Sequence, residues 1–182
     1  MSERYIWHEE DFPAEGEVVQ IQAVLLTADG RVLVRIKNGE ARLAGGRPEL
    51  EDTSLEETLR REVLEEANVE IDKIAYLGYQ EAISDLDGEE EVALQSRMVA
   101  LVTEISSAQP DPDSDNTWTY GRELLPRGQA TAAYVKSFGE IGQILIDLAY
   151  ARAEELGYFT ETRSEVAEVI NPEVRDRRAH TH

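Results

Sequence analysis

The sequence contains no cysteine among its 182 residues. This absence excludes a disulfide scaffold, a zinc site built from thiolates and a cysteine nucleophile. No apolar run approaches the roughly 18 residues that a membrane-spanning helix needs. The polar start Met1-Ser2-Glu3-Arg4 lacks the pattern of a signal peptide. The sequence therefore predicts a cytoplasmic protein that does not contact a membrane.

Basic residues are also scarce, since 18 Lys and Arg stand against 38 Asp and Glu and give a formal net charge of −20. So acidic a surface repels phosphate backbones, which argues against binding to polymeric nucleic acid. It would also repel a small anionic substrate unless a divalent cation stood between them. Hydrophobic residues still make up 41% of the chain, which is enough for a substantial core.

The length favours one main domain with a short segment on each side. Residues 1–17 form an N-terminal arm or strand that carries Trp7, Phe12 and Pro13 among many acids. Residues 18–160 hold the regular apolar patterns and form the domain. Residues 161–182 are expected to be a C-terminal tail, because few large apolar residues follow Ile170.

Within the domain, runs of Val, Ile and Leu predict strands, and one periodic stretch predicts a late helix. Asp29-Gly30 has the composition of a hairpin turn, and Asp85 to Gly88 is expected to form another turn. The strands are expected at 18–27, 31–37, 69–83 and 92–105, a loop at 106–117, and the late helix at 139–156. Strands on both sides of a central helix favour an α/β sandwich with a mixed sheet.

The central helix has clear signals at both ends. Ser54 is a good N-cap, and Glu57 three residues later completes a capping box. Asn68 stands at the expected end, where asparagine tolerates the left-handed cap conformation. A core-facing stripe with i, i+4 spacing runs along this helix: Leu55, Leu59, Val63 and Ala67.

One face of the same helix carries a cluster of carboxylates. Glu62, Glu65 and Glu66 occupy positions i, i+3 and i+4, where like charges repel each other. A hard divalent cation accepts several oxygen ligands and would offset that repulsion. The alternative is a solvated acidic face that is balanced by Arg60 and Arg61.

Two further features point towards a ligand, and each has a structural alternative. Gly45 and Gly46 precede the helix and let the backbone approach a substrate closely, although two glycines also suit an ordinary turn. Trp118 follows a loop rich in Pro and Asp and is a weak candidate for stacking on a base. Core packing explains it equally well.

The stretch from Gly45 to Val69 resembles the signature of the Nudix hydrolases, G-x5-E-x7-R-E-U-x-E-E-x-G-U, in which U is bulky and aliphatic. Its second half matches residues 61–67, Arg-Glu-Val-Leu-Glu-Glu-Ala. Asn68 replaces the family's glycine. The first half departs from the signature, because taking Gly46 as the first glycine implies one inserted residue. Glu51 or Asp52 then supplies the first acid.

The resemblance implies the family's α/β/α sandwich and a metal-dependent hydrolysis of a diphosphate linkage. The substrate would be a nucleoside diphosphate derivative, and Mg²⁺ or Mn²⁺ would neutralise the developing charge. By similarity, Glu62, Glu65 and Glu66 would be the metal ligands. Glu65, Glu66 and Arg61 would form the catalytic set, with Arg61 orienting a carboxylate.

Other interpretations stay open at the level of sequence. A Nudix-fold module that binds a nucleotide or acts as a sensor without catalysis is one, and an acidic α/β protein with a structural calcium site is another. Tyr5, Ile6 and Trp7 suit either a homodimer contact or an arm packed on its own domain. The leaving group, the number of metals and the general base are not determined.

Overall fold

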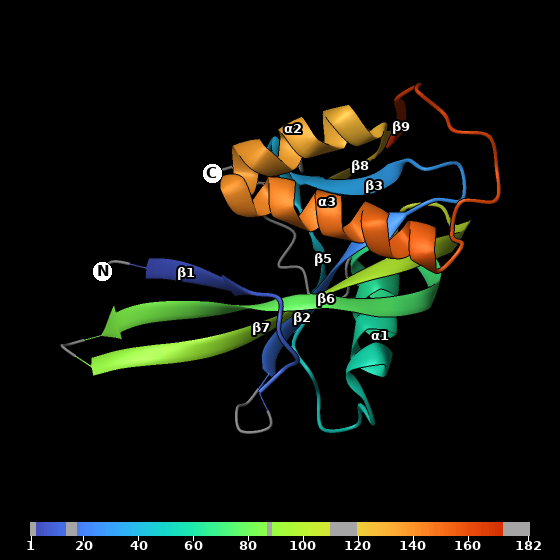
Figure 1. The fold of residues 1–182 in the computed structure, drawn as a ribbon. Helices are drawn as coiled ribbons and strands as arrows, with labels where there is room; N and C mark the ends of the chain where they lie inside the picture. The colour runs from blue at the N-terminus through green and yellow to red at the C-terminus, as the bar shows by residue number, and fades with distance from the viewer. Residues whose placement is uncertain (1–2, 14–17, 87–88, 110–119, 173–182) are drawn as a thin grey trace, which may run out of the picture.

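The structure is a computed structural model that describes residues 3–13, 18–86, 89–109 and 120–172. Its strands form one nine-stranded sheet in the order β1-β6-β7-β2-β3-β8-β9, with β4 beside β3 and β5 beside β2 (Figure 1). The strands are β1 (Glu3–His8), β2 (Val18–Leu26), β3 (Val32–Lys37), β4 (Glu40–Arg42), β5 (Ala44–Gly46), β6 (Val69–Leu86), β7 (Glu89–Ile105), β8 (Tyr120–Leu125) and β9 (Glu168–Asn171). The helices are α1 (Leu55–Ala67), α2 (Arg127–Phe138) and α3 (Glu140–Glu155).

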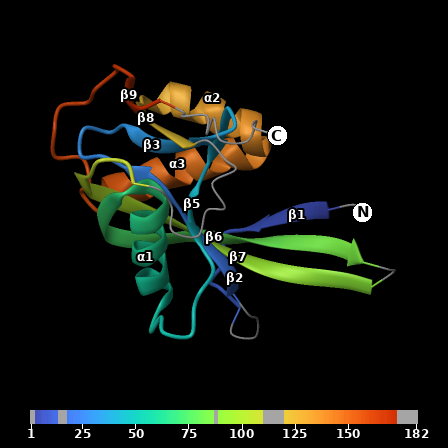
Figure 2. The same ribbon diagram turned by 180° about the vertical axis from the view of Figure 1, so that it is seen from behind.

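The strand β2 shows why the sheet is covered on both faces. Its residues alternate, so that Ile21 and Ala23 pack with the apolar stripe of α1, while Val24 and Leu26 pack with α2 and α3. Figure 1 and the reverse view in Figure 2 show α1 on one side of the sheet and α2 and α3 on the other. The predicted α/β sandwich is therefore confirmed.

The local predictions for the helices were partly correct. The helix predicted at 139–156 is α3, and the helix predicted after Ser54 is α1. The helix α2 was not predicted. It begins directly after Pro126, which makes no side-chain capping bond, so the usual start signal is missing. None of the helices in the described part of the chain has the length and apolar character to span a bilayer.

The long hairpin of β6 and β7 extends further than its sequence suggested. Asp85 pairs with Glu90 and Leu86 with Glu89, so Asp85 and Leu86 belong to the strand and not to the predicted turn. The remaining turn residues, 87–88, and most of the predicted loop at 106–117 lie outside the described residues. At the sheet edges, β1 pairs with β6 and β9 pairs with β8.

A fork in the sheet positions the functional site. The strands β2 and β3 pair at Leu25–Leu33 and Leu26–Val32. Beyond that point β5 pairs with β2 and β4 pairs with β3, so the two strands diverge around the chain that links β4 to β5. The helix α1 follows this link and packs against β5. The fork thus brings the glycine pair beside Glu62 and Glu66, in the second half of the carboxylate helix.

Candidate metal and substrate site

The cap and the buried stripe of α1 fix the direction in which its acids point. Ser54 accepts a hydrogen bond from the Glu57 backbone N–H at 3.2 Å, and Glu57 accepts one from the Thr53 backbone N–H at 2.8 Å. Leu59 and Val63 are fully buried against the sheet. Since Glu62, Glu65 and Glu66 follow these positions in the helical repeat, their carboxylates face the fork and the loop before the helix.

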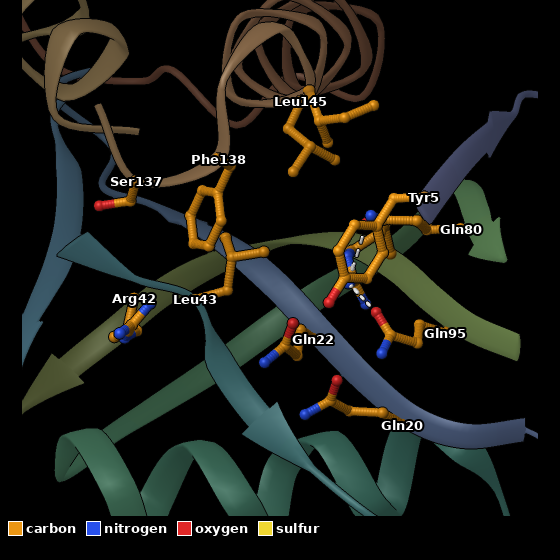
Figure 3. Close-up of a pocket in the computed structure, with 12 residues that line it drawn as sticks. Tyr5, Gln20, Gln22, Arg42, Leu43, Gln80, Gln95, Ser137, Phe138 and Leu145 are labelled. Carbon is orange, nitrogen blue, oxygen red and sulfur yellow. Dashed lines mark hydrogen bonds between the residues drawn. The ribbon is translucent and has the colours of Figure 1, made fainter. Parts of the chain in front are cut away.

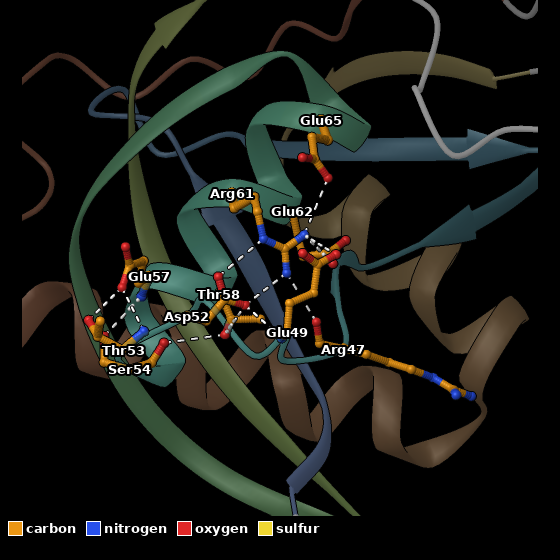
Figure 4. A network of polar contacts seen from close by, with 10 residues as sticks. All are labelled: Arg47, Glu49, Asp52, Thr53, Ser54, Glu57, Thr58, Arg61, Glu62 and Glu65. Carbon is orange, nitrogen blue, oxygen red and sulfur yellow. Dashed lines mark hydrogen bonds and ion pairs between the residues drawn. The ribbon is translucent and has the colours of Figure 1, made fainter.

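Arg61 is the centre of a polar network on this helix (Figure 4). Its Nη1 lies 2.9 Å from Glu62 Oε1 and 3.4 Å from Glu65 Oε2. Its Nε and Nη2 donate to the two carboxylate oxygens of Asp52 at 3.2 and 2.9 Å, and Nη2 also donates to the Arg47 carbonyl at 3.1 Å. One guanidinium therefore holds the loop before α1 against two of the three predicted ligands.

The structure identifies the acid that the first half of the signature left open. Asp52, and not Glu51, faces Arg61 through both carboxylate oxygens. Hydrogen bonds from Arg61 and from the backbone N–H of Glu49 lower the pKa of Asp52. Thr58 also donates to Asp52 at 2.9 Å. The inserted residue therefore lies between Asp52 and Arg61, where the chain enters the helix.

Glu66 is held separately from the Arg61 network. Its Oε2 accepts hydrogen bonds from Arg35 Nη1 at 2.6 Å and from the Gly45 backbone N–H at 2.9 Å. Arg35 lies on β3, is only 5% exposed and was missed as a site residue. The available signal was a cation in the middle of an otherwise apolar strand, because a buried charge needs a partner.

The two glycines are required by the close approach of the chain to its neighbours. A Cβ on Gly46 would lie 2.2 Å from the Glu62 carboxylate, and a Cβ on Gly45 would lie 2.1 Å from the Ile21 carbonyl oxygen. Gly45 also has a φ of +137°, which favours glycine. The pair therefore makes room for Glu62 and holds Glu66, while contact of either glycine with a substrate stays a prediction.

The residues fit a divalent cation in chemistry, although the side chains are engaged with arginines. In the part of the chain that the structure describes, no three acidic or histidine side chains gather closely enough to hold a metal. The donors are nevertheless hard carboxylate oxygens, and Gly46 leaves the space in which the Glu62 carboxylate lies. Burial raises the pKa of Glu62 despite the neighbouring Arg61. A cation would therefore take over the charge balance that Arg61 now supplies.

Trp118, the weak candidate for stacking on a base, lies outside the described residues. Glu90 of β7 pairs with Arg4 of β1 at 2.9 Å. Tyr120, at the start of β8, has the guanidinium of Arg35 and the ammonium of Lys37 each 5.3 Å from its ring centroid. Its ring therefore lies next to the cation that holds Glu66.

Comparison with known proteins gives a family and a set of related folds. A family model described as the NUDIX domain matches residues 16–136. A Bacillus subtilis pyrophosphohydrolase, BsRppH, is 17% identical with a TM-score of 0.61, and the match covers 87% of this chain and 99% of that one. A Nitrosomonas europaea NUDIX hydrolase is 14% identical with a TM-score of 0.53, over 76% of this chain and 90% of that one.

A third structure of similar fold was solved with a ligand. The NUDIX domain of Shewanella oneidensis NrtR in complex with ADP ribose is 19% identical with a TM-score of 0.51, and the match covers 80% of this chain and 94% of that chain. No curated protein sequence matches this chain at a significant level. At these identities the structural matches establish the fold.

Proposed function

The chain belongs to the NUDIX family, and we propose that it hydrolyses a diphosphate linkage in a nucleoside diphosphate derivative with the help of Mg²⁺ or Mn²⁺. The observation that carries this proposal is the arrangement of Glu62, Glu65 and Glu66 on one face of α1. All three carboxylates lie beside the sheet fork, and arginines hold each of them. The resemblance of the fold to a pyrophosphohydrolase supports the same reaction class.

In this proposal each side chain has a definite task. Glu62, Glu65 and Glu66 would hold the cation, which when bound neutralises charge on the diphosphate and lowers the pKa of a coordinated water. Arg35 and the Gly45 backbone N–H fix the Glu66 carboxylate. Asp52 accepts hydrogen bonds from the Arg61 guanidinium and would hold it at the loop when Glu62 and Glu65 bind a cation.

The substrate class follows from charge as well as from the fold. A chain with a net charge of −20 would recruit an anionic diphosphate through a bound cation. A NUDIX domain of similar fold binds ADP ribose, which belongs to this class of molecules. We therefore propose that this chain acts on a nucleoside diphosphate derivative. We do not assign ADP ribose itself as its substrate.

The test is cleavage of a panel that contains ADP-ribose, NADH, nucleotide sugars, dinucleoside polyphosphates and nucleoside triphosphates. Each substrate is assayed with Mg²⁺, Mn²⁺ or EDTA. We expect cleavage to require metal and to fall at least a hundredfold in Glu66→Gln. Glu56→Gln is the matched control, since Glu56 is an exposed acid in the first turn of the same helix. Cleavage that survives EDTA or Glu66→Gln would overturn the proposal.

Binding without cleavage is the second candidate function. The observation that favours it is the engagement of Glu62 and Glu65 by Arg61, together with the extra residue between Asp52 and Arg61. A sensor of this kind would be stabilised thermally by a panel member and would release no product from it. Metal-dependent turnover would exclude this candidate.

A further inference from the structure

A cavity of about 400 Å³ lies on the opposite face of the sheet from α1. Its floor is made of carboxamides and one arginine from β2, β6 and β7: Gln20, Gln22, Gln80 and Gln95, which Figure 3 labels, and Arg97. Its other wall is apolar and comes mainly from α2 and α3, including Phe138, Ile141 and Leu145. Cavities of this size with an apolar wall and a few polar groups are typical of small-ligand sites.

Arg97 is the unusual member of this floor, because it is a buried cation without an acid. It is 5% exposed, and within the described residues it takes part in no ion pair with a carboxylate. Among the residues that the structure describes, no aspartate or glutamate lines the cavity. Burial lowers the pKa of Arg97 to about 10, so the side chain stays charged at neutral pH. A buried cation without an acid is costly in a folded protein, and this cost points to a ligand that presents acceptors to its N–H groups.

The hydrogen bonds of Arg97 set the orientation of the neighbouring amides. Its Nη2 donates to Gln95 Oε1 at 2.6 Å and to Gln80 Oε1 at 3.2 Å. Since both amide oxygens are used in this way, each glutamine keeps its NH₂ group for another partner. The buried Nε of Arg97 has no hydrogen-bond partner in the described part of the chain. This part of the floor therefore offers donors, and it suits a ligand that presents acceptors.

The lining of this cavity overlaps with that of a second hollow, which includes the residue next to Gly46. A second hollow of about 360 Å³ shares Tyr5, Gln20 and Gln95 with the first and is also lined by Arg47. Arg47 directly follows Gly46, against which the Glu62 carboxylate lies. A molecule whose phosphates lie near Glu62 could therefore extend past Arg47 to Arg97.

We propose that this cavity binds the base of the nucleotide substrate. Arg97 then selects a base that presents a keto oxygen to it over a base that presents an amino group. Guanine fits best, because its O6 and N7 are adjacent acceptors, which suit the remaining donors of Arg97 together with the NH₂ groups of Gln80 and Gln95. Uracil also presents a keto oxygen there, whereas adenine and cytosine would direct an amino donor at the donors of Arg97, Gln80 and Gln95. The inference rests on the proposed function, since it assigns the base of that same substrate.

The experiment measures binding without turnover, so that a failure of catalysis does not affect it. GMP, UMP, AMP and CMP share one phosphate and differ in the base, and each is titrated calorimetrically without metal. We expect GMP and UMP to bind at least tenfold more tightly than AMP and CMP. Equal affinities, or a preference for AMP and CMP, would overturn the assignment.

Two variants test the role of Arg97, and a third is the control. Arg97→Met removes the cation. Gln95→Glu keeps the side-chain shape, gives Arg97 a carboxylate and removes one donor, so it tests the idea even if Arg97→Met does not fold. In both we expect the keto preference to fall to within about twofold. Arg4→Met removes an exposed arginine from β1 and should keep the preference. A preference that persists in Gln95→Glu would contradict the proposal.

Inorganic phosphate and pyrophosphate distinguish a base site from an anion site, because both anions are also rich in acceptors. One outcome would be that phosphate or pyrophosphate displaces bound GMP as effectively as further GMP does, and that Arg97→Met abolishes this displacement. In that case Arg97 binds a phosphate and the base assignment is wrong. Cleavage of GDP-glucose and ADP-glucose separates the two proposals. Equal cleavage of both would leave the hydrolase proposal intact and overturn the base preference.

Discussion

Replacing Gly46 by alanine would move Glu62 without disturbing the fold. The new Cβ would lie 2.2 Å from the Glu62 carboxylate, so that carboxylate must shift by roughly 1 Å to restore van der Waals contact. A misplacement of about 1 Å can lower a rate by about 100-fold. That factor corresponds to about 2.7 kcal/mol of activation free energy. Since the obstructing atoms are the end of a flexible side chain, the stability of the fold should change little.

Three quantities are measured for each variant and for wild type: kcat for the best panel substrate, the affinity for Mn²⁺ and the midpoint of urea unfolding. Gly46→Ala should lower kcat and weaken Mn²⁺ binding while keeping a midpoint close to wild type. Gly45→Ala is the contrasting variant, because its Cβ would lie 2.1 Å from the Ile21 carbonyl oxygen at a φ of +137°. Such strain costs roughly 1–3 kcal/mol and should lower the midpoint. Wild-type kcat and Mn²⁺ affinity in Gly46→Ala would refute a role for the Glu62 position.

Three further predictions concern the scaffold. Leu59→Ala should lower the free energy of unfolding by about 2–5 kcal/mol, since Leu59 is fully buried between α1 and the sheet; an unchanged urea midpoint would contradict this. Arg122→Met should destabilise the fold by roughly 1–3 kcal/mol, because Arg122 donates to buried carbonyl groups at the end of α1, and chemical unfolding measures the loss. Burial alone would raise the pKa of Asp29, but hydrogen bonds from Thr27 and Arg31 lower it. The stabilisation by Asp29 is then present above its ordinary pKa of 3.8 and is lost as the pH falls. Unfolding of wild type and Asp29→Asn should therefore differ at pH 7 and converge as the pH falls below 3.8.

The elements that were predicted correctly depend on contacts between near neighbours in the chain. The limits of α1 follow from Ser54 and Asn68, which bond to backbone groups three or four residues away. The Asp29-Gly30 turn is equally local, and Gly30 has the positive φ that such a turn requires. These interactions are visible in the sequence because both partners lie within one helical turn or one hairpin.

The features that were missed depend on partners far apart in the sequence. The strands β2 and β7 pair in parallel over residues about 75 positions apart, and no local pattern specifies that pairing. Arg35 was treated only as a strand residue, because its partner Glu66 lies 31 positions later. The helix α2 begins without a capping side chain. In each case tertiary packing, and not local propensity, determines the structure.

The distribution of charge between surface and interior connects these observations with function. The chain carries 38 acids and only 18 basic residues, yet the buried charged residues that the structure describes are all arginines: Arg35, Arg97 and Arg122. Arg122 binds the carbonyl end of α1, where a cation is favoured. Arg35 holds Glu66, and Arg97 lines the cavity beyond the fork. An anionic ligand would be repelled over most of the surface and attracted mainly where a bound cation or these arginines face it. This arrangement favours selective entry at the fork, and raising the ionic strength should weaken the repulsion more than the buried contacts.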